Sequence, residues 1–145
     1  MLRTVLAVTA IAVGVTVVAA QSDPISARKA LMKEVGAQTK TGGGMAKGEV
    51  PYDQTKAQAI FATYVDASAK VPTLFPENSK TGGDTAALPA IWANKADFDA
   101  KFVKFGADAK AAQASVKDLD SFKGAFSGVT KNCGGCHETY RAKKS

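Results

Sequence analysis

Five consecutive residues near the end of the chain, Cys-Gly-Gly-Cys-His at positions 133–137, hold both of its cysteines and its only histidine. The preceding segment repeats apolar residues every three or four positions, which is the period of a helix, and Cys133, Cys136 and His137 continue that series. All three side chains are therefore predicted to face inward from one C-terminal helix. This placement constrains both the fold and the chemistry of the chain.

Two thiols at i and i+3, followed at once by an imidazole, are typical of covalent haem attachment. The thiols can add to the two vinyl groups of a haem to form thioether bonds, and the imidazole can bind the iron. Gly134 and Gly135 would leave room for the porphyrin edge against the helix backbone. We therefore predict that Cys133 and Cys136 bind one haem c and that His137 is a metal ligand.

Three other interpretations of the motif fit less well. A thioredoxin-type dithiol belongs at a helix N-terminus after a strand, whereas this pair follows helical residues. A structural zinc site needs about four ligands, and the chain has no further cysteine or histidine. A disulfide between residues three positions apart would close a very small loop and restrain the unfolded chain little.

The N-terminus predicts export. Arg3 is followed by an apolar run of about 14 residues, which is short of the roughly 20 needed to span a bilayer, and then by Ala19 and Ala20. We predict a signal peptide over residues 1–20 and a single domain over residues 21–145, with no stable membrane insertion. The formal net charge of +6, with Lys131, Arg141, Lys143 and Lys144 around the motif, favours an acidic partner protein.

A haem iron has two axial positions, and the chain has no second histidine for the one that His137 leaves open. Once residues 1–20 are removed, Met32 and Met45 are the remaining methionines. Met32 lies in the well-formed part of a predicted helix and is the better candidate, although a buried methionine is often only a core filler. If Met32 only packs over the iron, the site is open to a small gas such as NO or CO.

Arg28 precedes Met32 by one helical turn, so both are predicted to lie on the same face. Its planar guanidinium suits a haem propionate, and we predict that Arg28 contributes to cofactor binding. The alternative is an ordinary exposed residue of the helix surface.

Proline and glycine divide the rest of the chain into four amphipathic helical stretches without strand-type alternation. The first is predicted from about Ser26 to Thr39, where the Gly42–Gly44 run weakens it, and the second follows an N-cap at Asp53 and ends before Pro72. A long loop covers residues 71–89. The third helix begins at Ala90 and the fourth near Asp118. The predicted fold is an all-α antiparallel four-helix bundle with haem c near its C-terminus.

Several segments resemble the class II cytochromes c, the cytochrome c′ family. They are ARKALMK at 27–33, KGEVPYD at 47–53, TLFPENS at 73–79, IWANKADFD at 91–99 and the C-terminal CGGCHETYRAKKS. These segments are most similar to the low-spin cytochrome c-556 branch, in which methionine binds the iron. The resemblance implies a periplasmic four-helix bundle, thioethers at Cys133 and Cys136, His137 as proximal ligand, Met32 on the distal side and Arg28 near the haem edge.

The functional expectation is a periplasmic monohaem electron carrier that is not an enzyme. The alternative is a five-coordinate cytochrome c′ that binds NO or CO. No nucleic-acid partner is expected, and both a monomer and a homodimer remain open, although the polar residues Gln38, Thr39 and Lys40 favour a monomer.

Overall fold

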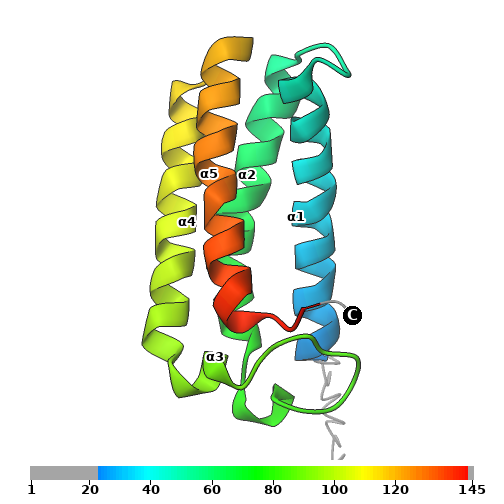
Figure 1. Ribbon diagram of the computed structural model, residues 1–145, viewed down its shortest axis with the longest axis vertical. Helices are drawn as coiled ribbons and strands as arrows, with labels where there is room; N and C mark the ends of the chain where they lie inside the picture. The colour runs from blue at the N-terminus through cyan, green and yellow to red at the C-terminus, as the bar shows by residue number, and fades with distance from the viewer. Residues whose placement is uncertain (1–22, 144–145) are drawn as a thin grey trace, which may run out of the picture.

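The computed structural model describes residues 23–143 and consists of four long helices side by side. They are α1 (Pro24–Lys47), α2 (Gln54–Lys70), α4 (Lys95–Ser115) and α5 (Leu119–Tyr140). The chain runs up and down the bundle in this order (Figure 1), which confirms the predicted antiparallel four-helix bundle. The predicted signal peptide lies outside the described residues. Within residues 23–143, no helix is both long and apolar enough to cross a membrane.

The apolar faces of the predicted amphipathic helices form the core. Ala57, Ile60 and Phe61 of α2 are completely buried, as are Ala109 of α4 and Phe122 of α5. Aromatic rings pack against each other in the core, so that Phe122 contacts Phe61 of α2 and Phe126 of its own helix. Burial of these large side chains supplies the main driving force for the fold.

The predicted end of the first helix at Thr39 is wrong, because α1 continues through the glycine run to Lys47. Gly42 is buried against α5, and a β-carbon at this position would lie 2.4 Å from Cε2 of Phe126. The intrinsic helix cost of glycine is thus offset by a close approach of two helices that a side chain would prevent. The helix ends at Gly48, whose left-handed φ of 76° forms the C-cap.

Capping residues set the starts of α2 and α5. The Asp53 carboxylate accepts a hydrogen bond from the Lys56 amide, and the predicted N-cap is confirmed. Asp118 and Ser121 form a reciprocal capping box at the start of α5. The predicted third helix is instead two helices, α3 (Ala90–Ala93) and α4, because the backbone leaves helical geometry at Asn94.

The segment over residues 71–89 crosses one end of the bundle. It contains two 3-10 turns, η1 (Val71–Leu74) and η2 (Glu77–Ser79), and then runs to α3. Its last part pairs with the chain beyond α5, because the Leu88 amide donates to the Tyr140 carbonyl and the Ala142 amide donates to the Ala86 carbonyl. The start of α1, the end of α5 and this segment therefore meet at the same end (Figure 1).

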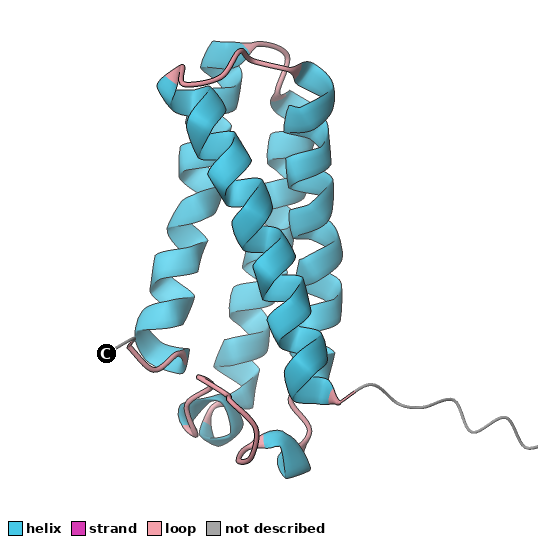
Figure 2. Cartoon of the chain, turned by 90° about the vertical axis from the view of Figure 1, so that its right-hand side faces the viewer, coloured by secondary structure: helices cyan, strands magenta, loops and turns pink. Residues whose placement is uncertain are grey.

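Helix α1 crosses the other helices at a clear angle (Figure 2). It approaches α5 closely at Gly42 and Phe126 and diverges from it toward the end that carries the 71–89 segment. The cysteine motif lies in the last turns of α5, on the diverging side. The fold thus separates two helices at the position where the sequence predicts a cofactor.

Candidate haem site

The last turns of α5 bring Cys133, Cys136 and His137 to the interior side of the bundle, as the helical spacing predicted. All three side chains are partly buried, and Cys133 and Cys136 form no disulfide with each other. Burial raises the pKa of both thiols. A redox dithiol instead needs an acidified thiolate, so this environment does not suit one.

Two adjoining cavities open to solvent beside the motif. Met32, Phe102, Cys136 and His137 line both of them. Together the cavities form one space between α1, α4 and α5, walled at one end by the 71–89 segment.

The first cavity is lined mainly by apolar side chains and the cysteines. Its walls are Met32 and Val35 of α1, Lys101, Phe102 and Phe105 of α4, and Asn132, Cys133, Cys136 and His137 of α5. A flat hydrophobic macrocycle requires this kind of lining, with a few polar atoms at defined places. The sulfur of Met32 and the imidazole nitrogen of His137 are also donors that suit the iron of a haem. The residues therefore fit the predicted group.

The environment of His137 favours the neutral imidazole. Burial lowers the pKa of His137, and the nearby positive charge of Arg141 lowers it further. A neutral ring keeps a lone pair for a metal, so His137 is available as a ligand at neutral pH.

Within residues 23–143, no three His, Cys, Asp or Glu side chains are grouped to hold a metal ion, as a protein-only zinc site would require.

The two candidate methionines lie in different surroundings. Met32 is partly buried and lines both cavities with His137. Met45 is 1% exposed, lines neither cavity, and belongs to the core beside a surface hollow that includes Pro51 and Tyr52. Met45 therefore fits the role of a core filler, and Met32 is the methionine placed beside the cysteine motif.

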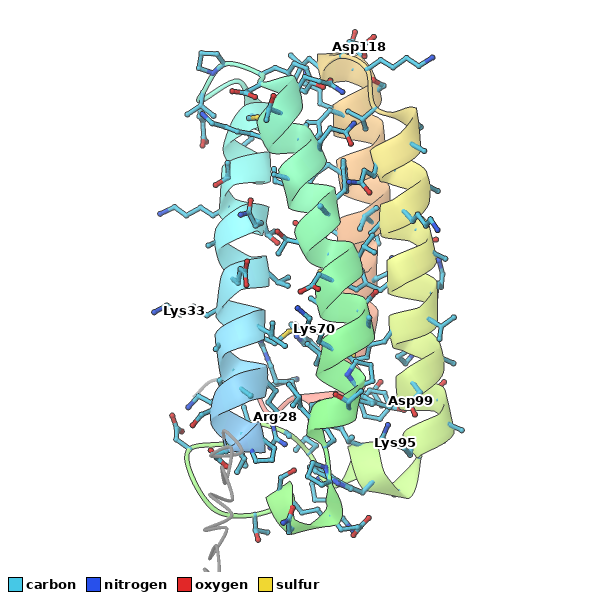
Figure 3. The ribbon with its side chains drawn as sticks, turned by 180° about the vertical axis from the view of Figure 1, so that it is seen from behind. Arg28, Lys33, Lys70, Lys95, Asp99 and Asp118 are labelled. Atoms are coloured by element: carbon cyan, nitrogen blue, oxygen red, sulfur yellow. The ribbon has the colours of Figure 1, made fainter. Side chains whose placement is uncertain are left out.

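Arg28 is buried at the lower end of α1 (Figure 3), with 4% of its surface exposed, and it lines the second cavity. The alternative of an exposed surface residue is thus wrong. Its two terminal nitrogens donate four hydrogen bonds to the 71–89 segment, with acceptors on Leu74, Ser79 and Thr85. These contacts leave Nε–H as the donor not used by that segment.

The basic residues predicted around the motif differ in how close they lie to the cavities. Lys131, Arg141 and Lys143 are exposed, and Arg141 also lines the second cavity. Lys144 lies outside the described residues. Lys29 lines the second cavity as well and forms an ion pair of 2.9 Å with Asp84.

Sequence reasoning missed several wall residues. Phe102 and Phe105 belong to the apolar stripe of α4, so their burial was predictable although their place at the cavity was not. Asn132 adjoins Cys133, and its amide donates to Asp108 of α4 over 2.8 Å. Phe75, Thr85 and Ala87 reach the second cavity from the irregular segment, and no periodic signal marked them.

The bundle and its site define a class: a helical protein that binds a prosthetic group between α1 and the C-terminal helix through a Cys-x-x-Cys-His motif. A family model described as cytochrome c′ matches residues 23–141. The chain belongs to the cytochrome c′ family, whose members carry covalent haem c.

Individual relatives support the same assignment. A cytochrome c′ of Rhodopseudomonas palustris is 52% identical over 126 residues, which cover 87% of this chain and 86% of that protein. A cytochrome c-556 of the same organism is 34% identical over 148 residues, covering 99% of each chain. The solved structure of cytochrome c′ from R. palustris superposes with a TM-score of 0.83 at 51% identity, covering 86% of this chain and all of that chain.

The predicted family is thus confirmed, and relatives of both branches are found. The 52% identity is shared with a cytochrome c′ and the 34% identity with a cytochrome c-556. Overall sequence likeness therefore does not favour the low-spin branch, and the choice between an occupied and an open distal position depends on the residues of the site itself.

Proposed function

We propose that this chain is a periplasmic electron-transfer cytochrome in which Cys133 and Cys136 form the thioether bonds and His137 and Met32 supply the axial ligands. The observation that carries the proposal is that Met32 and His137 come from different helices and line the same two cavities together with Cys136. Met45, the other methionine of the exported chain, is enclosed in the core away from these cavities.

Bound haem supplies a one-electron couple between ferric and ferrous iron. The chain determines how that couple is held. His137 offers a neutral imidazole, and Met32 offers a neutral, soft sulfur that favours the ferrous state. Phe102 and Phe105 limit the access of water to the site, which also favours the less charged state.

Arg28 is proposed as a partner of a haem propionate. It lines the second cavity with Lys29 and Arg141, so three cationic side chains surround this part of the site. A carboxylate near them would be favoured by charge. A propionate would have to reach Nε–H of Arg28, because the terminal nitrogens already donate to the 71–89 segment.

The proposed partner is an acidic redox protein that meets the basic side chains near the motif in a small, transient contact. Export through residues 1–20 would bring the chain to such a partner in the periplasm. The described residues offer His137 as their only imidazole, and we propose a carrier rather than an enzyme.

A second candidate function is a five-coordinate cytochrome c′ that binds NO or CO beside Met32. The 52% identity with a protein named cytochrome c′ favours this candidate. In that case Met32 packs in the cavity without binding the metal, and a small neutral ligand takes the distal position.

The absorption spectrum of the Met32→Leu protein distinguishes the two functions. Leucine keeps the volume and removes the sulfur, so a low-spin spectrum should become high-spin if Met32 is a ligand. Met45→Leu is the matched control, because it makes the same change in the core away from the cavities. A spectrum that is the same in the Met32→Leu and parent proteins would remove Met32 from the ligand role.

A further inference from the structure

The guanidinium of Arg28 is a buried cation whose hydrogen-bond acceptors are all neutral. Nη1 donates to the Leu74 carbonyl at 3.0 Å and to Ser79 Oγ at 2.9 Å. Nη2 donates to the Ser79 carbonyl at 3.0 Å and to Thr85 Oγ1 at 2.8 Å. Burying a charge among neutral groups is costly, so the contacts that compensate for it must be well formed.

These four hydrogen bonds reach three separate points of the 71–89 segment. Leu74 ends η1, Ser79 ends η2, and Thr85 lies in the irregular part that follows. Ser79 is itself 2% exposed, and its hydroxyl donates back to the Pro76 carbonyl. One side chain of α1 thus holds both short turns and the stretch after them.

Two aromatic rings complete the surroundings of Arg28. Its guanidinium carbon lies 4.5 Å from the centre of the Phe75 ring and 5.9 Å from that of Trp92. The Trp92 indole donates to the Phe75 carbonyl at 2.9 Å, so the rings are fixed relative to each other. Phe75 then packs on Phe98, whose ring contacts both Phe102 and Tyr140. The contacts of Arg28 therefore continue into the wall of the haem cavity.

We propose that Arg28 is a positioning residue that fixes the 71–89 segment as the end wall of the haem cavity and so limits the access of solvent to that site. Lysine could keep the charge but not the forked contacts, since an ammonium is a compact point charge on a flexible stem. The neighbouring Lys29 also reaches this segment through Asp84, but that ion pair is exposed and such pairs contribute little. This inference rests on the proposed function only in taking the cavity as the haem site.

Amide hydrogen exchange of the haem-loaded protein tests the positioning role directly. The amides of Ser79, Lys80 and Ala87 donate hydrogen bonds within the segment and report its order. In Arg28→Lys they should exchange about tenfold faster or more, because several charge-assisted hydrogen bonds are lost. Amides of α2 and α4 serve as the internal reference and should change much less. Lys29→Gln, the matched control on the same helix, should leave the segment close to the parent.

The reduction potential supplies a readout that a purely structural role would not move. Arg28→Lys keeps the charge, so entry of solvent beside the cavity should lower the potential. Lys33→Arg keeps the charge at an exposed position of α1 that lines neither cavity, and it should shift the potential less. Thr85→Val removes the hydroxyl that accepts from Arg28 and also from the Ala87 amide, so its effect is read on the Ser79 and Lys80 amides alone. There it should give a smaller effect of the same sign, even if Arg28→Lys does not accumulate.

Unchanged exchange of the segment in Arg28→Lys and Thr85→Val would overturn the positioning role, as would equal acceleration throughout the bundle. The exchange result does not depend on whether Met32 binds the metal. Failure of this inference is therefore distinguishable from failure of the proposed ligation.

Discussion

The α-carbon of Gly42 faces the ring of Phe126 so closely that a β-carbon on residue 42 would lie 2.4 Å from Cε2 of that ring. This contact holds α1 against α5 at one end of the bundle, while the two helices diverge toward the haem site (Figure 2). Gly42, the first glycine of a run that weakens α1 as an isolated helix, therefore positions α1 within the bundle.

Gly42→Ala should destabilise the protein, because Phe126 is packed between helices and can yield only by displacing its neighbours. The expected cost is about 1–3 kcal/mol in the free energy of unfolding, measured by urea denaturation. Gly43→Ala is the matched control: a β-carbon on residue 43 would have no atom within 4 Å, and the change should stabilise the helix by up to about 1 kcal/mol. Equal effects of the two substitutions would show that the contact with Phe126 does not matter.

Much of the fold could be predicted because local signals agree with the final packing. The apolar period of α5 and the N-caps at Asp53 and Asp118 each depend on a few adjacent residues. The end of α1 could not be predicted in this way. Glycine is favourable at position 42 because of the close approach of Phe126, which lies far along the chain.

The site was predictable to a similar degree. The cysteine motif and Met32 lie on helices, so their spacing indicated which faces they occupy. The acceptors of Arg28 are 46 to 57 residues away and lie in an irregular segment, where no period indicates the direction of a side chain. The prediction that Arg28 is near the cofactor thus gave no indication that it holds this segment.

Alkaline pH should destabilise the protein through Tyr64. Burial raises the pKa of Tyr64 to about 12, against 10.0 for the ordinary group. Above pH 10 the folded state therefore keeps a proton that the unfolded state releases. The contribution of Tyr64 to the free energy of unfolding is fully present below pH 10 and is lost as the pH rises from about 10 to 12.

Tyr64→Phe should reduce this loss of stability, which can be measured by denaturation between neutral and alkaline pH. The variant should also lose about 0.5–1.5 kcal/mol at neutral pH, because the Tyr64 hydroxyl donates to Thr39 Oγ1, which in turn donates to the Val35 carbonyl. Tyr140, whose pKa is likewise raised to about 12 by its hydrogen bond to Asp97, is unchanged in this variant and leaves part of the pH dependence in place. An identical pH profile for parent and variant would contradict the assignment.

Removal of both thiols should abolish covalent attachment of the haem. The chain has only Cys133 and Cys136, so Cys133→Ser/Cys136→Ser should have the mass of the bare polypeptide after denaturation, whereas either single variant can keep one thioether bond. Intact-mass measurement under denaturing conditions checks this expectation. A double variant that retains the added mass would contradict attachment through these sulfurs.

Electron exchange with an acidic redox protein should depend on the charge beside the motif. Lys131→Glu should slow association several-fold at low salt, with the difference shrinking as ionic strength rises. Lys123→Glu makes the same change in net charge on α5, but it lies about 12 Å from Lys131 along the helix, toward the start of α5. This separation exceeds the Debye length of about 8–10 Å at physiological salt. Stopped-flow kinetics should show the larger effect for Lys131, and equal effects would contradict local steering.

Addition of CO to the reduced, haem-loaded protein tests the ligation of Met32 most directly. If Met32 and His137 both bind the metal, the distal position is occupied, and the spectrum should stay low-spin and shift only slowly or slightly after mixing. The Met32→Leu protein should bind CO promptly under the same conditions. Prompt and complete CO binding by the parent protein, at the same rate as Met32→Leu, would contradict the proposed ligand pair and identify an open distal site.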